Sequence, residues 1–161
     1  MNVHIRRLRE GEGEAVVRLS LAAWAPVFHS FEQVLGTEIF TRQYPNSQTG
    51  QRGVVEGTCA EQGTTTVWVA EVEGRIAGFI AIEVNDEDRI GEVQLLAVAP
   101  AFQNQGVGTA LNEFALRTMK EAGMRLAVAA TGGDPGHAPA RRSYEKAGYF
   151  PLPLVRYYKA L

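Results

Sequence analysis

The stretch Glu92-Val-Gln-Leu-Leu-Ala-Val-Ala-Pro-Ala-Phe-Gln-Asn-Gln-Gly-Val-Gly-Thr-Ala-Leu111 decides how this chain folds. Its first part is rich in valine and leucine, which is typical of a strand, and Pro100 ends that run. A short polar turn with Gly106 and Gly108 follows. Apolar positions then recur at the spacing of one helix face: Val107, Ala110, Leu111, Phe114, Ala115, Thr118 and Met119. The stretch therefore predicts a strand, a glycine-containing turn and a helix in direct succession.

This succession is suited to binding an anion. The first backbone N–H groups of a helix have no partner inside the helix, and the helix dipole is positive at that end. Gly106 and Gly108 have no Cβ atom that would keep a ligand away from the backbone. A P-loop is excluded because no Lys-Ser or Lys-Thr follows Gly108, and a dinucleotide fingerprint because position 111 is leucine instead of a third glycine. We expect an anion cradle, most simply for a pyrophosphate.

Two motifs resemble those of the GNAT acetyltransferase superfamily. The pattern Gln103-x-x-Gly106-x-Gly108, with Val-Ala-Pro before it and Thr-Ala-Leu after it, resembles the family's coenzyme A signature. Further on, Ala140-Arg-Arg-Ser-Tyr144-Glu-Lys-Ala-Gly-Tyr149 resembles the family's Ala-x-x-x-Tyr-Glu-Lys-x-Gly-Phe block, with Tyr149 where phenylalanine is common. The two motifs stand in the family's order and at a similar separation, so we identify the chain as resembling this family.

The hydrophobic pattern predicts the elements around these motifs. Strands are expected over residues 3–7, 64–71, 75–84, 125–130 and 154–159, besides the strand that holds Glu92. Helices are expected over 12–25, where Pro26 interrupts the pattern, over 29–40, from 107 to about 122, and over 138–147, whereas 44–63 reads as a loop with some helix in it. The order matches the layout of the GNAT fold, which implies an α/β protein with a central mixed, mostly antiparallel sheet flanked by helices, and a single domain over residues 1–161.

Composition narrows the class of protein. The formal net charge is −2, from 16 basic and 18 acidic residues, so neither a nucleic acid nor an anionic membrane surface is favoured as a partner. No segment resembles a signal peptide or a membrane span. One cysteine, Cys59, excludes an internal disulfide and fits a reducing compartment. We expect a cytoplasmic location, no metal, and no part for Cys59 in the chemistry.

The resemblance implies that acetyl-CoA is the co-substrate. The cradle residues would contact it: Gln103, Asn104, Gln105, Gly106, Val107, Gly108 and Thr109. In the family, main-chain groups at the positions of Leu96 and Val98 pair with the pantetheine arm. Many members carry basic residues where this chain has Gln103-Asn104-Gln105, so backbone N–H groups would carry more of the binding here. His137 stands where the family often has a pantetheine-binding asparagine; it is either a cofactor contact or a plain loop histidine.

The chemistry that the resemblance implies needs a base and an acid. Only a neutral amine attacks a thioester, so a carboxylate, or a water that it holds, must take a proton. Glu92 is the candidate base, with Glu83 as its rival and a merely solvated carboxylate as the alternative. Tyr144 is the candidate acid that protonates the leaving thiolate, although it shares a helix face with alanines and could simply be a core aromatic. Attack is direct, with no covalent enzyme intermediate.

The sequence says least about the acceptor amine. Trp24 and Phe28 are the candidate substrate contacts, unless they only pack the core, and no acidic cluster indicates a polycation. We predict an N-acetyltransferase acting on a small-molecule or peptide amine, and a homodimer stays open. The alternative from another class is a non-catalytic acyl-CoA-binding sensor, which would need neither Glu92 nor Tyr144. An acetyltransferase acting on charged tRNA is disfavoured by the net charge.

Overall fold

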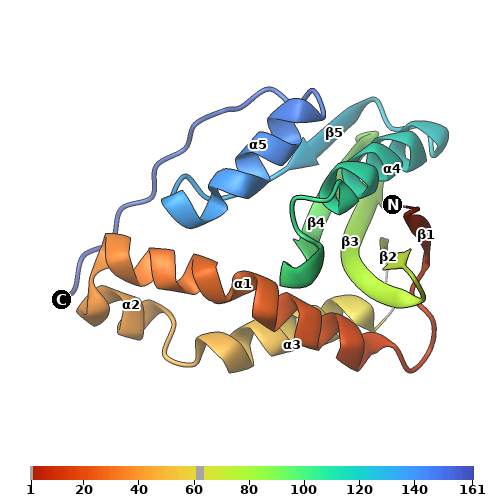
Figure 1. Cartoon of the computed structure of the whole chain (residues 1–161). Coiled ribbons are helices and arrows are strands. Elements are labelled where there is room, and N and C mark those ends of the chain that lie inside the picture. Colours follow the sequence, from red (N-terminus) through yellow and green to blue (C-terminus); the bar gives the residue numbers. More distant parts are fainter. Residues whose placement is uncertain (1, 61–63) are drawn as a thin grey trace.

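A mixed five-stranded sheet lies between two layers of helices in the computed structural model, which describes residues 2–60 and 64–161 (Figure 1). The strands follow one another in sequence order across the sheet: β1 (His4–Arg7), β2 (Thr65–Val72), β3 (Arg75–Asn85), β4 (Ile90–Val98) and β5 (Leu126–Ala129). The first three pairings are antiparallel, and β4 pairs with β5 in parallel. The predicted mixed, mostly antiparallel sheet is confirmed.

The helices are α1 (Gly13–Leu35), α2 (Thr37–Gln43), α3 (Ser47–Cys59), α4 (Val107–Glu121) and α5 (Ala138–Lys146), with short 3-10 turns η1 (Pro100–Phe102) and η2 (Pro135–His137). Helices α1 and α3 cover one face of the sheet, whereas α4 covers the other (Figure 1). The strand, turn and helix predicted from the opening stretch are β4, η1 with its polar turn, and α4. They lie where the sequence pattern places them.

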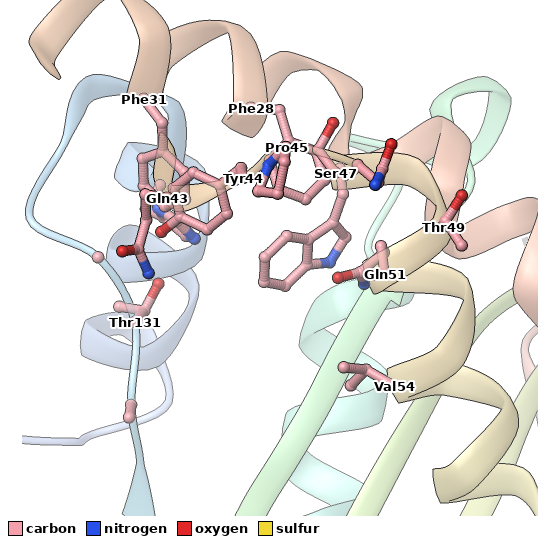
Figure 2. A pocket seen from close by; sticks show the side chains of 16 residues that line it. Phe28, Phe31, Gln43, Tyr44, Pro45, Ser47, Thr49, Gln51, Val54 and Thr131 are labelled. Carbon is pink, nitrogen blue, oxygen red and sulfur yellow. The ribbon is translucent and has the colours of Figure 1, made fainter. Parts of the chain in front are cut away.

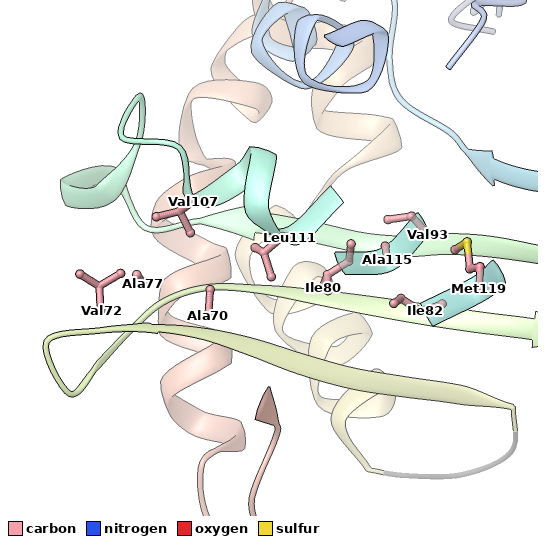
Figure 3. Packing of buried hydrophobic residues seen from close by; sticks show 10 residues of the cluster. All are labelled: Ala70, Val72, Ala77, Ile80, Ile82, Val93, Val107, Leu111, Ala115 and Met119. Atoms are coloured by element: carbon pink, nitrogen blue, oxygen red, sulfur yellow. The ribbon is translucent and has the colours of Figure 1, made fainter. Parts of the chain in front are cut away.

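Alternation along β3 supplies both layers with apolar side chains. Ile80 and Ile82 point toward α4, where Leu111 and Met119 are buried against them (Figure 3). Phe79 and Ala81 point the other way, into a cluster with α1 and α3 that includes Val16, Val17 and Val55. The central strand is thus apolar on both faces, and this fixes α1 and α4, which carry the site, on opposite sides of the sheet.

Gly78 on β3 lets α4 approach the sheet closely. A Cβ atom there would lie 2.9 Å from the carbonyl oxygen of Ala97 and 3.1–3.2 Å from side-chain carbons of Leu111 and Val107. Backbone cannot move aside cheaply, so Gly78→Ala is expected to lower the free energy of unfolding by roughly 1–3 kcal/mol. Urea unfolding of both proteins measures this, with Gly50→Ala, where a Cβ meets nothing within 4 Å, as the control. Equal loss in both variants would contradict the close packing.

The first helices differ from the prediction. α1 runs through Pro26 to Leu35 without a break, and Gly36, with φ at 76°, separates it from α2. Proline removes one helical hydrogen bond, but α1 buries residues on both sides of Pro26, including Val17 and Val27, and this packing keeps the helix continuous. The predicted boundaries at residues 25 and 29 were therefore wrong.

The stretch 44–63 is mostly helical, since α3 spans Ser47–Cys59; residues 61–63 lie outside the described part. Its mean apolar character is low, but Val55 is fully buried and Gln51 is nearly so, with Gln51 Nε2 donating to Ser20 Oγ at 2.9 Å. The glycines and polar residues of this stretch favour a loop by local propensity, but the helix is stabilised by its contacts with α1. Cys59 therefore ends a helix instead of lying in a loop, and burial raises the pKa of its thiol.

No strand forms over residues 154–159, so the predicted closing strand was wrong. A strand needs a neighbour for its N–H and C=O groups. After α5 the chain passes Pro151 and Pro153 and continues toward the ends of α1 and α2, away from the edge of the sheet at β5 (Figure 1).

Candidate functional site

The sheet opens between β4 and β5. Their pairing runs only from Ile90–Leu126 to Val93–Ala129, and a β-bulge at Gln94 interrupts the register of β4 against β3 directly after that point. From Gln94 on, β4 is paired with β3 alone within the described chain. Main-chain groups of Leu96 and Val98 on the open side are thus available to a ligand, with one exception: the Val98 carbonyl accepts a hydrogen bond from Gln103 Nε2 at 3.0 Å.

The predicted cradle leads from the end of β4 into α4. Asn104 and Gly106 adopt the left-handed conformation, with φ at 59° and 89°, and no side chain of the described residues caps the helix at Gly106. The amides of Gln103 and Gln105 bind the loop itself, since Gln105 Nε2 donates to the Ala101 carbonyl at 2.9 Å. The N–H groups that open α4 at Val107 and after it therefore remain for an anion.

Helix α5, which holds Tyr144, contacts this end of α4 through the neighbouring Ser143. Asn112 of α4 donates to Ser143 Oγ at 2.9 Å, and a Cβ built on Gly108 would lie 3.8 Å from the same hydroxyl and 3.7 Å from a methyl of Val98. The Tyr144 ring packs edge-on against Tyr149 with 5.5 Å between centroids. Burial, with a smaller contribution from Tyr149, raises the pKa of Tyr144 to about 12. Its phenol is therefore protonated throughout the neutral range.

A pocket of about 760 Å³ opens between α1, the segment joining α2 to α3, and the loop after β5 (Figure 2). Aromatic rings form one wall: Trp24 and Phe28 lie 6.0 Å apart, and Phe31 stacks on Tyr44 at 5.4 Å. Trp24 and Phe28, the predicted substrate contacts, both line it. The lining among the described residues is completed by Gln43, Pro45, Asn46, Ser47, Thr49, Gly50, Gln51, Val54, Ala130, Thr131, Gly132 and His137, and contains no Asp, Glu, Lys or Arg.

His137 lines this pocket from the loop that follows β5. Its ring is 5.8 Å from Trp24 and 5.4 Å from Phe31, and its side chain is 11% exposed. Its Nδ1 atom lies 2.5 Å from Oδ1 of Asp134. Asp134 and Ser30, which donates to the other carboxylate oxygen at 2.7 Å, were not singled out from the sequence. The sequence signal that could have pointed to these two residues is the pair of glycines beside Asp134. A Cβ atom at Gly132 or Gly136 would overlap the side chains of Ser30, Asp134 and His137.

The Acetyltransferase (GNAT) family model matches residues 34–149, well over half of the chain. The chain belongs to the GNAT family. The matched part contains the cradle, the opened β4 and Tyr144, whereas Trp24, Phe28 and Ser30 lie before it.

Curated relatives match a part of this GNAT chain. The mycothiol acetyltransferase of Streptomyces coelicolor is 34% identical over 82 residues, which are 51% of this chain and 26% of that protein. The matched segment of the chain therefore covers about a quarter of the length of that relative.

Solved structures match over the whole length. AAC(6')-Iy in complex with the bisubstrate analog CoA-S-monomethyl-acetylneamine superposes with a TM-score of 0.67 at 16% identity, covering 100% of this chain and 99% of that one. An aminoglycoside acetyltransferase from an uncultured soil metagenomic sample, in complex with sisomicin, gives 0.61 at 20% identity, with 99% and 96% covered. At these identities the likeness establishes the fold.

Glu92, the predicted base of this GNAT chain, is half-buried on β4 directly opposite Glu83 of β3. Glu83 accepts hydrogen bonds from Thr64 at 2.9 Å and from Gln94 at 2.6 Å. Neither glutamate is part of the pocket lining. The role of Glu92 stays a prediction, as does that of the cradle residues.

Neither a membrane-spanning helix nor a metal cluster occurs among the described residues. None of their helices is both long and apolar enough to cross a membrane. Within residues 2–60 and 64–161, no group of three or more His, Cys, Asp or Glu side chains is arranged to hold a metal ion.

Proposed function

We propose that this GNAT chain transfers the acetyl group of acetyl-CoA to a primary amine by direct attack on the thioester. The observation that carries the proposal is the open side of β4, which leads through the polar turn into the uncapped start of α4. The uncharged aromatic pocket, which is lined by the loop directly after β5, supports it. Family membership and the CoA-containing analog bound by the neighbour AAC(6')-Iy support this reading. The part of the curated relatives that matches is too small to transfer their acceptor.

Acetyl-CoA would be held mainly by backbone. Its pyrophosphate would accept hydrogen bonds from N–H groups at the start of α4, around Val107, Gly108 and Thr109, where the helix dipole adds attraction. Its pantetheine arm would pair with main-chain groups of Leu96 and Val98 where β5 has ended. Gln103 and Gln105 would act by shaping the loop, because their amides are already bonded to it.

Tyr144 is the proposed acid. As the C–S bond breaks, the thiolate needs a proton, and a phenol whose pKa is raised to about 12 by burial holds its proton until that moment. The sequence-based candidate for the proton acceptor is Glu92, directly or through a water. Its position on β4, outside the pocket lining, makes the water-mediated form the more suitable of the two.

The acceptor is proposed to be a compact amine with an apolar or aromatic body. Trp24 and Phe28 would pack against that body, and the absence of carboxylates from the described lining gives no attraction for several positive charges. This differs from an acceptor such as sisomicin, the ligand of the metagenomic neighbour, which carries several amines. Benzylamine and phenethylamine are suitable probes.

The function is tested by titrating acetyl-CoA into the protein and then measuring thiol release with a panel of amines. We expect binding, and release that is faster with phenethylamine than with spermidine or sisomicin. Binding without release on any amine would support the acyl-CoA sensor instead. A protein that does not bind acetyl-CoA would overturn the proposal.

We also propose that a second copy of the chain covers the C-terminal segment. Six apolar residues there are each at least 74% exposed, namely Phe150, Leu152, Leu154, Val155, Tyr157 and Leu161, while the sheet edge at β5 has no neighbouring strand among the described residues. An extended apolar segment and a free edge complement each other between two copies. Sedimentation is expected to give twice 17.6 kDa, and a monomer for Leu154→Asp with Val155→Asp. A monomeric unmodified chain would refute it.

A further inference from the structure

The loop between β5 and α5 holds a buried histidine–carboxylate pair. His137 Nδ1 and Asp134 Oδ1 are 2.5 Å apart, and the two side chains are 11% and 7% exposed. The second oxygen of Asp134 accepts a hydrogen bond from Ser30 Oγ at 2.7 Å and another from the backbone N–H of Gly136 at 3.0 Å. Helix α1 and the loop therefore fix the carboxylate from opposite sides.

This arrangement fixes the histidine tautomer. Burial alone would raise the pKa of Asp134, but the hydrogen bonds from Ser30 and His137 outweigh it, so that the pKa lies below its usual value. An ionised carboxylate only accepts hydrogen bonds, so the proton of a neutral imidazole must sit on Nδ1. Nε2 then carries a lone pair, and no hydrogen bond within the described chain uses it.

The lone pair belongs to a ring that lines the acceptor pocket, between Trp24 and Phe31. From α1, these two rings and the Ser30 hydroxyl face His137 without any charge. The charged and titratable groups around it are Asp134 beside it, Arg141 of α5, which donates to the carbonyls of Gly132 and Asp134, and the Tyr44 phenol across the pocket. Arg156 and Tyr158 of the C-terminal segment lie beyond Tyr44.

We propose that His137 is the group that takes the proton from the acceptor amine, and that Asp134 and Ser30 position it. The inference rests on the proposed acetyl transfer and names a different proton acceptor from Glu92. As the amine nitrogen bonds to the thioester carbon, its proton moves to Nε2. The C–S bond then breaks, the thiolate takes the Tyr144 proton, and the imidazolium proton leaves to solvent while the phenolate is reprotonated. Product amide and free thiol result, with no other reactant.

The backbone of the loop is adapted to this pair. A side chain at Gly132 would overlap Asp134 and His137, and one at Gly136 would lie 2.7 Å from Cβ of Ser30. The segment Thr131-Gly-Gly-Asp-Pro-Gly-His137 is thus spaced so that the carboxylate and the imidazole fit between α1 and the loop.

The test compares His137→Gln, Glu92→Gln and the control His4→Gln, whose histidine is exposed on β1. With phenethylamine as the probe, His137→Gln should lower kcat by about 30-fold, somewhat less than a full general-base effect because water can substitute. Its KM should change little, because the ring is proposed to act on the proton of the amine and not on binding. An unchanged kcat in His137→Gln together with a lowered kcat in Glu92→Gln would overturn the proposal in favour of Glu92.

Two readouts distinguish proton transfer by His137 from a role in binding alone. If His137 only contacts the pantetheine, His137→Gln weakens acetyl-CoA binding in a titration and leaves kcat in place, which would overturn the proposal. Independently of activity, NMR of the three histidines should find one with its proton fixed on Nδ1 in the unmodified chain and released from that tautomer in Asp134→Asn. Failure of the proposed function, by contrast, would appear as absence of thiol release from the unmodified protein, with this NMR signature intact.

Discussion

Gly108→Glu is expected to weaken acetyl-CoA binding by at least about 100-fold, because a carboxylate would stand where the pyrophosphate is proposed to bind. The site has space for the substitution in the free protein. A Cβ atom at position 108 makes only ordinary contacts, 3.7 Å from Val98 Cγ2 and 3.8 Å from Ser143 Oγ, and φ of this glycine is not positive. The melting temperature should therefore stay close to that of the unmodified chain, and isothermal titration measures the affinity.

Gly108→Gln is the matched control, since it has nearly the same size without the charge. It should weaken binding less than Gly108→Glu, and the difference should shrink at high salt, because screening reduces repulsion between charges. If Gly108→Glu bound acetyl-CoA as the unmodified chain does, the start of α4 would not be the phosphate site.

Tyr144→Phe is expected to lower kcat by about 100-fold, the lower range for removal of a general acid. Acetyl-CoA affinity should change little, because the ring and its packing on Tyr149 remain. Since burial raises the pKa of Tyr144 to about 12, its phenol is protonated below that value. The loss should accordingly be uniform from about pH 6 to 9.

Single-turnover measurements of thiol release provide the comparison, with Tyr157→Phe as the control because Tyr157 is 89% exposed in the C-terminal segment. Unchanged turnover in Tyr144→Phe would mean that another group, or water, protonates the thiolate. Equal losses in both tyrosine variants would point to a general effect on stability instead of the acid.

The sequence predicted the centre of the fold better than its periphery. The spacing of apolar residues in β4 and α4 is that of elements with one buried face, and it was sufficient to predict both. The structure buries three of these residues in one cluster, namely Val93, Leu111 and Met119. α3 was predicted only as some helix within a loop, because few of its residues are apolar and its contacts with α1 are not visible in local sequence patterns. The strand expected at 154–159 failed for the opposite reason: its residues suit a strand, but no neighbouring strand lies beside them within the described chain.

The site, too, combines residues that local sequence patterns select with residues that only tertiary contacts bring together. Gly106, Gly108 and Tyr144 belong to contiguous motifs, so local spacing was sufficient to select them. Ser30 and Asp134 are 104 positions apart, and only folding brings them to hydrogen-bonding distance. Glu92 is the opposite case: its place on a strand could be predicted, but its absence from the pocket lining depends on how α1, α3 and the loop after β5 pack, which a local pattern does not contain.

Because the pairing of β4 with β5 ends at Val93, the proposed binding of acetyl-CoA along β4 would make the sheet of the loaded protein differ from that of the free protein. Beyond Gln94, β4 lacks a strand on one side within the described chain, so the amides of Leu96 and Val98, which point to that side, are expected to exchange with solvent deuterium in the unliganded protein. The next amide, that of Ala99, is bonded to the Ala77 carbonyl of β3. A pantetheine arm lying along β4 would supply the missing partner. The co-substrate would then occupy the place of a sixth strand. The hydrogen bonds of β4 on its open side would be satisfied only while acetyl-CoA is bound.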